Sequence, residues 1–262
     1  MTASLQLIAV PGIPLVKPGV DLVGLIIAGM AGARLVLQDH DVVVIAQKIV
    51  SKAEGRFMDL ATVVPSTQAE ALAREVQKDP RLVELILSES RRVVRSGKDV
   101  LIVEHRLGFV MANAGVDQSN VAEPGDRQLV LMLPHILMRF YTVPDASAAR
   151  LQKELEHRSG CEVGVVINDS FGRPWRLGTV GVAIGCAGLP ALLDFRGHPD
   201  LFGRRLQVTV VAYADEIAAA ASLLMGQADE ARPVVIVRGL PRHDRRLPAS
   251  SLIRPSEEDL FR

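Results

Sequence analysis

The segment Glu-Val-Gly-Val-Val-Ile-Asn-Asp-Ser-Phe-Gly-Arg, residues 162–173, combines a strand pattern with a polar end. Its first half is a continuous apolar run, which is typical of a strand buried on both faces. Asn168, Asp169 and Ser170 follow directly, so we expect the strand to deliver them at its carboxyl end. A carboxylate followed by a hydroxyl can supply adjacent ligands to a hard cation. Alternatively, the same residues begin a tight turn with Asp169 as its cap.

Around this strand the sequence predicts further strands and helices in irregular order. A second buried strand is expected at Val42–Ala46 and its continuation to residue 52. Other strands are predicted at residues 5–10, 91–95, 100–105, 108–112, 206–214 and 233–237. Helices are predicted at residues 21–31, 145–160 and 215–225. Another helix is predicted to begin at Thr67, which forms a capping box with Glu70, and a further one to run from Asp79-Pro80 to residue 90. The order is no strict βαβ alternation, so it predicts a mixed α+β fold.

The composition describes an ordinary globular protein. Of 262 residues, 48% are hydrophobic and 23% charged, and 30 basic residues balance 30 acidic ones. We therefore expect no general attraction to nucleic acid or to a membrane, and the low aromatic content of 4% argues against a base-stacking surface. Cys161 and Cys186 are too few for a disulfide framework, which favours a reducing cytoplasm. Residues 1–245 are expected to form the domain and 246–262 a peripheral tail.

A second acidic segment follows the strand predicted at residues 108–112. It reads Asn-Ala-Gly-Val-Asp-Gln-Ser-Asn, residues 113–120. Its small residues allow a ligand to approach the backbone, and Asp117 offers a hard oxygen to Mg²⁺ or Mn²⁺. The alternative is a turn whose polar side chains satisfy their own backbone.

Two more segments carry groups suited to a nucleotide. Lys48 and Lys52 lie four residues apart at the predicted end of a buried strand, where they could bind phosphate or simply be solvated. After the helix predicted to end at Met225, Gln227 and Asp229 could reach a metal or a ribose. Alternatively, Gly226 is only a helix-terminating residue before a polar turn.

Several common signatures are absent from the sequence. It contains no G-x-x-x-x-G-K-[ST] phosphate loop, no G-x-G-x-x-G, no G-x-S-x-G and no H-E-x-x-H, and its six histidines are not closely paired. Any metal is therefore expected to be hard and bound by oxygen.

Taken in order, these segments resemble the coenzyme F420:L-glutamate ligases, which add γ-linked glutamate to a deazaflavin coenzyme. The resemblance runs from about residue 5 to 242 and rests on residues 12–16, 47–56, 113–120, 168–173, 178–188 and 200–240. It implies an unusual α+β fold of two closely packed lobes, a homodimer, GTP with Mg²⁺ or Mn²⁺ (two ions), and assistance by K⁺.

The resemblance also implies roles for individual residues. The metal ligands would be Asp117, Asp169, Ser170 and Gln227, with both aspartates indispensable to catalysis. The nucleotide contacts would be Ile13, Pro14, Leu15, Val16, Gln47, Lys48, Lys52, Asn120, Met225, Gly226, Gln227, Ala228, Asp229, Glu230, Ala231 and Arg232. Two positions depart from the family pattern. Some relatives have small hydroxyl residues in place of Gln47-Lys48, and archaeal members have a glutamate in place of Gln227.

The implied reaction activates a carboxylate by phosphorylation from GTP, and the amine of glutamate then attacks the acyl phosphate. Arg173, Arg176 and Arg196 are candidates for holding the phosphodiester or carboxylates of the acceptor. Alternatively, each is an exposed arginine that pairs with a neighbouring side chain. Two other functions remain open. A metal-dependent phosphohydrolase would use the same acidic turns with water as acceptor, and a nucleotide-binding regulatory module would bind GTP without turnover.

Overall fold

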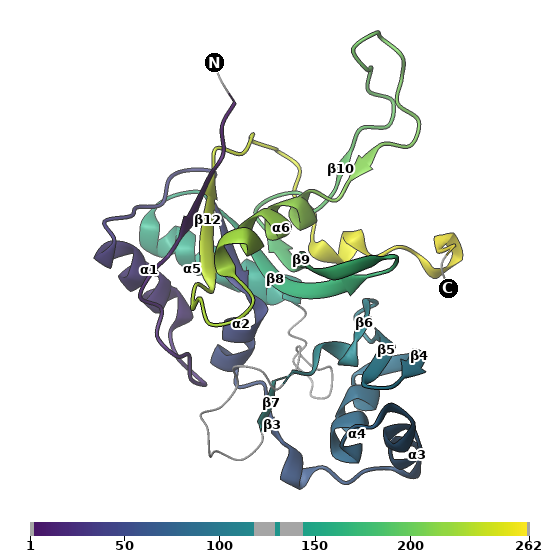
Figure 1. Cartoon of the computed structure of the whole chain (residues 1–262). Coiled ribbons are helices and arrows are strands. Elements are labelled where there is room, and N and C mark those ends of the chain that lie inside the picture. Colours follow the sequence, from purple (N-terminus) through teal and green to yellow (C-terminus); the bar gives the residue numbers. More distant parts are fainter. Residues whose placement is uncertain (1–2, 118–128, 132–143, 261–262) are drawn as a thin grey trace.

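A five-stranded mixed sheet forms the centre of the protein. The computed structural model describes residues 3–117, 129–131 and 144–260. The strand order is β1 (Gln6–Ala9), β12 (Val234–Arg238), β2 (Val42–Ala46), β8 (Gly164–Arg173) and β9 (Arg176–Ala187). β2 and β8 are parallel, and the other neighbouring pairs are antiparallel. This mixed sheet, with its helices, agrees with the predicted α+β class (Figure 1).

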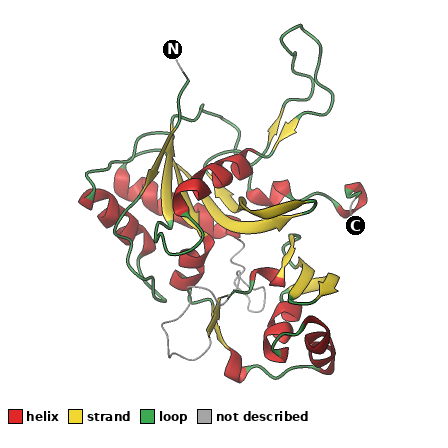
Figure 2. Ribbon diagram, viewed as in Figure 1, coloured by secondary structure: helices red, strands yellow, loops and turns green. Residues whose placement is uncertain are grey.

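Helices cover both faces of the sheet. α1 (Leu22–Gly32) and α5 (Pro144–Ser159) pack on the face that carries Val43, Ile45 and Ile167, while α6 (Tyr213–Met225) packs on the face that carries Val44 and Val166 (Figures 1 and 2). Both faces are therefore buried, which explains the unbroken apolar runs of β2 and β8. Burying each such Val or Ile side chain stabilises the fold by roughly 1.5–3 kcal/mol.

A separate group of elements has its own hydrophobic core around Leu60, Ile86 and Leu101. It consists of α3 (Thr67–Val76), α4 (Pro80–Ser88), β4 (Ser90–Gly97), β5 (Val100–His105) and β6 (Val110–Ala112). β4, β5 and β6 form an antiparallel sheet, as the predicted hairpin requires. The division into two lobes and the homodimer stay predictions.

Shorter elements complete the chain. β3 (Phe57–Asp59) pairs with β7 (Leu129–Leu131), and β10 (Leu193–Asp194) pairs with β11 (Val210–Val211) at the base of a hairpin that extends away from the sheet (Figure 1). α2 (Gln47–Ala53) follows β2 directly. In the part of the chain that the structure describes, 3₁₀ turns occupy Leu60–Thr62, Asn113–Gly115, Ala249–Leu252 and Ser256–Glu258. Within the described ranges, no helix is long and apolar enough to cross a membrane.

Local capping signals are partly confirmed. Asp79 caps α4, where its carboxylate accepts a 2.8 Å hydrogen bond from the Arg81 amide and Pro80 starts the helix. The cap of α3 is Ser66, so the expected capping box at Thr67 is wrong by one residue. Asp145 lies inside the first turn of α5, where its carboxylate accepts amide hydrogens from other elements instead of capping the helix.

Several predicted strands have different boundaries. The strand does not continue through Lys52, because residues 47–53 form α2. β8 runs on to Arg173, so Asn168 and Asp169 lie within the strand and not at its end. The strand expected at residues 206–214 is reduced to Val210–Val211.

The longest strand, β9, is not among the predicted strands, because its glycines resemble a loop. Two of these glycines, Gly181 and Gly185, are required by close packing. A side chain at Gly181 would place its Cβ 2.5 Å from the carbonyl oxygen of Ala218 in α6, and one at Gly185 would lie 2.5 Å from the carbonyl oxygen of Pro144.

The C-terminal segment is not the peripheral arm that the sequence suggests. The Ala191 amide donates to the Leu247 carbonyl at 3.0 Å, and the amides of Ala249 and Ser250 donate to the Asp145 carboxylate at 2.8 and 3.1 Å. Ala249 is fully buried. Residues 247–253 are therefore part of the folded body.

Candidate functional site

The sheet topology brings four predicted segments to one edge. β2 and β8 are parallel, with Ala46 beside Asn168, so the residues after Ala46 lie next to those around Asp169. The Ala46 amide also donates to the carbonyl of Pro233, and the Val10 amide donates to that of Val234. Residues 10–16, 47–52, 168–170 and 226–233 therefore share this edge (Figure 1).

Both lysines of the second segment lie on α2, one helical turn apart. Lys52 is buried, and burial together with the nearby positive charge of Lys48 lowers its pKa. Gln47 is also buried, and its amide nitrogen donates to the Ser51 hydroxyl at 2.5 Å. The site thus concentrates positive charge on one face of α2, while the Gln47 side chain stabilises the helix itself.

The two acidic segments meet at α2. The Lys48 ammonium lies 2.7 Å from the Asp117 carboxylate. Burial raises the pKa of Asp169 to about 6, and the negative charge of Asp117 contributes to this rise. The Ser170 amide, which donates to the Asp169 carboxylate at 2.8 Å, and the positive charge of Lys48 both lower this pKa. Two carboxylates and one ammonium group therefore interact in one cluster, although they lie far apart in the sequence.

The turn before Asp117 has an unusual backbone. Asn113, Ala114 and Gly115 have φ angles of 54°, 51° and 67°, and the Val116 amide closes the turn on the Asn113 carbonyl at 2.9 Å. Each non-glycine residue in this left-handed region costs on the order of 1 kcal/mol or more, and such strain is concentrated at functional sites. The turn fixes the direction in which the chain enters Asp117.

Asn168 is buried between β8 and the end of α6 and has no role in the sequence prediction. Its amide nitrogen donates to the Ser222 hydroxyl at 3.0 Å and contacts the Met225 sulfur at 3.3 Å. Its amide oxygen is buried and has no hydrogen-bond partner among the described residues. Asn168 thus joins the strand of Asp169 to the helix that precedes the loop at residues 226–232. Its position directly before Asp169 is the feature of the sequence that could have indicated this role.

The loop after α6 is organised by its own glutamate. Gly226 ends the helix with φ 72°, and the Ala228 amide donates to the Glu230 carboxylate at 2.9 Å. Hydrogen bonds from the backbone amides of Ala228, Glu230 and Gln227 lower the pKa of the Glu230 carboxyl. The polar-turn interpretation of this segment is therefore correct at the level of the backbone.

The remaining predicted residues are placed as follows. Val16 is buried, Ile13 is partly buried and packs beside α1, and Leu15 is exposed at the same edge. Asn120 lies outside the described residues. The nucleotide-contact set of Ile13, Pro14, Leu15, Val16, Gln47, Lys48, Lys52, Met225, Gly226, Gln227, Ala228, Asp229, Glu230, Ala231 and Arg232 stays a prediction.

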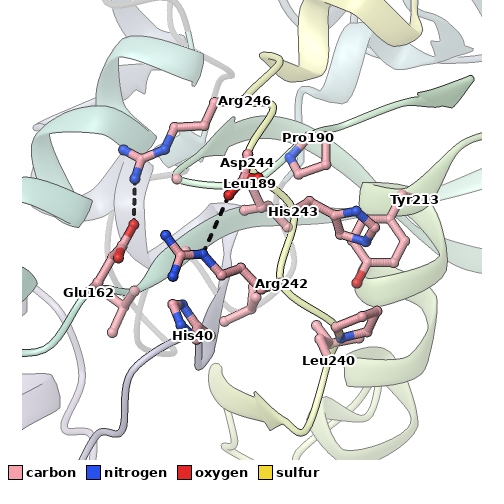
Figure 3. A pocket seen from close by; sticks show the side chains of 15 residues that line it. His40, Glu162, Leu189, Pro190, Tyr213, Leu240, Arg242, His243, Asp244 and Arg246 are labelled. Carbon is pink, nitrogen blue, oxygen red and sulfur yellow. Dashed lines mark hydrogen bonds and ion pairs between the residues drawn. The ribbon is translucent and has the colours of Figure 1, made fainter.

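A polar cavity of about 100 Å³ lies at the opposite ends of β2 and β8, beside Val42 and Gly164. Figure 3 shows His40, Tyr213 and His243 around it, with Arg246 paired to Glu162 at 2.6 Å. None of the predicted site residues lines this cavity. It is therefore separate from the edge that carries Asp169.

The family model described as F420-0:Gamma-glutamyl ligase matches residues 12–239. The chain belongs to this family. The coenzyme F420:L-glutamate ligase of Methanothermobacter thermautotrophicus is 47% identical over 98% of this chain and 99% of its own length. The protein of the same name from Methanocaldococcus jannaschii is 45% identical over 88% of each chain, and that from Haloarcula marismortui is 38% identical over 98% and 96%. The resemblance deduced from the motifs is thus confirmed.

The family's expected hard metal can be tested against this cluster of side chains. The described residues contain no group of three or more His, Cys, Asp or Glu side chains able to hold a metal ion. The predicted ligand set would not form such a group, because it contains only two carboxylates, those of Asp117 and Asp169. Ser170 and Gln227 would add a hydroxyl and an amide oxygen. Burial, with a smaller contribution from the charge of Asp117, raises the pKa of Asp169, and a bound cation would favour its ionised form. The donor set therefore suits Mg²⁺ or Mn²⁺.

Proposed function

We propose that this protein is a GTP-dependent ligase that adds L-glutamate through γ-glutamyl amide bonds to the deazaflavin coenzyme F420-0 and to its glutamylated forms. Family membership and the names of the relatives support the choice of substrates. The cluster of Lys48, Asp117 and Asp169 supports the use of a metal and a nucleotide. The proposal includes two divalent ions, K⁺, a cytoplasmic location and a homodimer.

The observation that carries the proposal is the meeting of Asp117 and Asp169 beside Lys48. The two carboxylates repel each other, since the charge of Asp117 adds to the raised pKa of Asp169, while Lys48 pairs with Asp117 and opposes that rise. In this proposal Asp117, Asp169, Ser170 and Gln227 hold the metal. When bound, the metal supplies charge neutralisation to phosphate oxygens.

The lysines of α2 would bind the phosphates of GTP. Lys52 is buried beside Lys48, and its pKa is lowered first by burial and then by repulsion from the positive charge of Lys48. A polyphosphate would relieve that repulsion. The loop at residues 226–232 lies at the same edge, where in this proposal it would contact the same ligand.

The chemistry follows from the weak reactivity of a carboxylate. An oxygen of the acceptor carboxylate attacks the γ-phosphorus of GTP, the bond to the β-phosphate oxygen breaks, and GDP leaves. The amine of glutamate then attacks the carbonyl carbon of the acyl phosphate, loses a proton, and inorganic phosphate leaves as the amide forms. For the first step, the protein acts mainly by positioning and by charge stabilisation.

Mass spectrometry of the deazaflavin tests this proposal directly. The purified protein is incubated with F420-0, GTP, Mn²⁺ and L-glutamate, and products heavier by one or more glutamyl residues are expected. Omission of any one component should abolish them, and Asp169→Ala should do the same. GTP hydrolysis without the acceptor would identify a phosphohydrolase, and GTP binding without turnover would identify a regulatory module.

A further inference from the structure

A small apolar cavity of about 200 Å³ lies beside the strand that carries Asp169. Phe171 and Val182 of the large sheet form one side of this open cavity, Phe109 and Val110 of the β5–β6 hairpin form another, and Ile253 of the C-terminal segment forms a third. All of these residues belong to the described part of the chain. The cavity therefore lies where three distant segments meet.

Strand register places this cavity next to the proposed metal site. Asp169 of β8 is paired with Val182 of β9, so their side chains are cross-strand neighbours on one face of the sheet. Paired residues of antiparallel strands have Cα atoms about 4.5–5.5 Å apart. Phe171 lies two residues further along β8, on the same face as Asp169. One wall of the cavity thus begins directly beside this carboxylate.

Side-chain packing and hydrogen bonds fix the other walls of the cavity. Phe109 and Phe171 meet edge to face, with ring centroids 5.7 Å apart. Ile253 packs against Gly108, where any side chain would come within 2.8 Å of it. The segment before Ile253 is fixed by the amides of Ala249 and Ser250 on Asp145. This wall lies beyond residue 239, where the family match ends.

Two polar side chains line the otherwise apolar cavity. Asp215, at the start of α6, accepts a 2.9 Å hydrogen bond from the Ala183 amide, and Arg254 is exposed to solvent. Ligand sites are typically apolar with a few polar groups that fix orientation. Glutamate, which is charged at both ends, does not match the aromatic walls, whereas a flat fused ring with a polar edge does. The phosphodiester of such an acceptor would complement Arg254.

We propose that this cavity binds the tricyclic ring of the deazaflavin acceptor, an inference that rests on the proposed function. At about 200 Å³ the cavity is smaller than the roughly 300–1,000 Å³ of sites that enclose a whole ligand. It therefore takes the ring alone, edge-on, with Asp215 at the polar edge. The ribityl and phosphodiester chain then leads out past Arg254 and toward the carboxylates, where the reacting end meets GTP.

The test fills the cavity without touching the cluster of Lys48, Asp117 and Asp169. Val110 is 40% exposed and lines the cavity, whereas Val100 is 46% exposed, lies on the neighbouring strand β5 and does not. Val110→Trp should raise the KM for F420-0 by about tenfold or more and leave the KM for GTP and for glutamate within about twofold, whereas Val100→Trp should change none of them.

A direct binding measurement separates this inference from the proposed function. A ribityl-deazaflavin without the lactyl phosphate is titrated against the protein in the absence of GTP, metal and glutamate, and its fluorescence is followed. Val110→Trp should weaken binding by about tenfold, and Arg254→Ala, an exposed and structurally mild change, should weaken binding of F420-0 by about threefold or more. Thermal melting checks that each variant is folded.

The outcomes are distinct. Unchanged ring binding and an unchanged KM for F420-0 in folded Val110→Trp would overturn the cavity assignment even if the wild-type protein is an active ligase. A selective rise in the KM for glutamate would overturn it as well. Loss of ring binding in Val110→Trp together with an inactive wild-type protein would support the cavity and refute the ligase proposal.

Discussion

Replacement of Asp169 by asparagine should make the metal-free protein more stable. Burial raises the pKa of this carboxyl from its ordinary 3.8 to about 6. Its ionised form is therefore disfavoured in the folded protein. Asparagine has nearly the same shape, and its amide oxygen can still accept the hydrogen bond that the Ser170 amide makes to Asp169 at 2.8 Å. The substitution removes the charge and keeps the packing.

The size of the effect follows from the pKa and depends on pH. A rise from 3.8 to about 6 corresponds to a penalty of about 3 kcal/mol on the folded state once the group is ionised in both states. Because the Asp169 side chain keeps partial contact with solvent, we expect a gain of about 1–3 kcal/mol in Asp169→Asn. Below pH 3.8 both states are protonated and the gain vanishes; it grows between pH 3.8 and 6 and is constant above.

Urea denaturation of both proteins between pH 4.5 and 8, with EDTA or with Mn²⁺, measures this gain. Mn²⁺ should stabilise the wild-type protein and not Asp169→Asn, so the difference between their free energies of unfolding should become smaller or change sign. Asp244→Asn, at a side chain that is 96% exposed, serves as the control and should change neither curve. A variant that is less stable than the wild type at pH 8 without metal would refute the account of Asp169 as a destabilised carboxylate.

Three further predictions concern packing and charge. Gly181→Ala should destabilise the protein by about 2 kcal/mol or more in denaturant titrations, because its Cβ meets α6, whereas Gly172→Ala, with open space around it, should be nearly neutral. Arg238→Met should cost about 3 kcal/mol in the same assay, since it removes the two hydrogen bonds of 2.8 and 2.6 Å that Arg238 donates to the buried Asp41 carboxylate. The double change with Asp41→Asn should recover part of this loss. Lys48→Gln should raise the KM for GTP by about tenfold or more; an unchanged KM in steady-state kinetics would contradict its assigned role.

Local signals predicted many elements of the fold. The apolar runs of β2 and β8 were evident because both faces of the sheet are covered, and Asp79-Pro80 marked the start of α4 because capping depends on neighbouring residues only. β9 was not predicted because a segment with several glycines is typical of a loop. Only the close approach of α6 and Pro144 explains Gly181 and Gly185, and this approach is a tertiary contact.

The same division applies to the candidate site. The types of residue that it uses, and their order along the chain, were evident in the sequence and were enough to indicate the family. That Lys48 pairs with Asp117 is a contact between α2 and the chain that follows β6. That Asp169 lies close enough to Lys48 for its pKa to change depends on the parallel pairing of β2 with β8.

By itself the sequence determined the family, the mixed class of fold and the acidic and basic segments, because motif order and apolar runs are properties of the chain alone. Only the tertiary structure decided which of those segments meet, that residues 47–53 form a helix, and that the C-terminal segment lines a cavity beside the strand of Asp169. Strand pairing and close packing are interactions between residues far apart in the chain, and each depends on partners that no local pattern specifies.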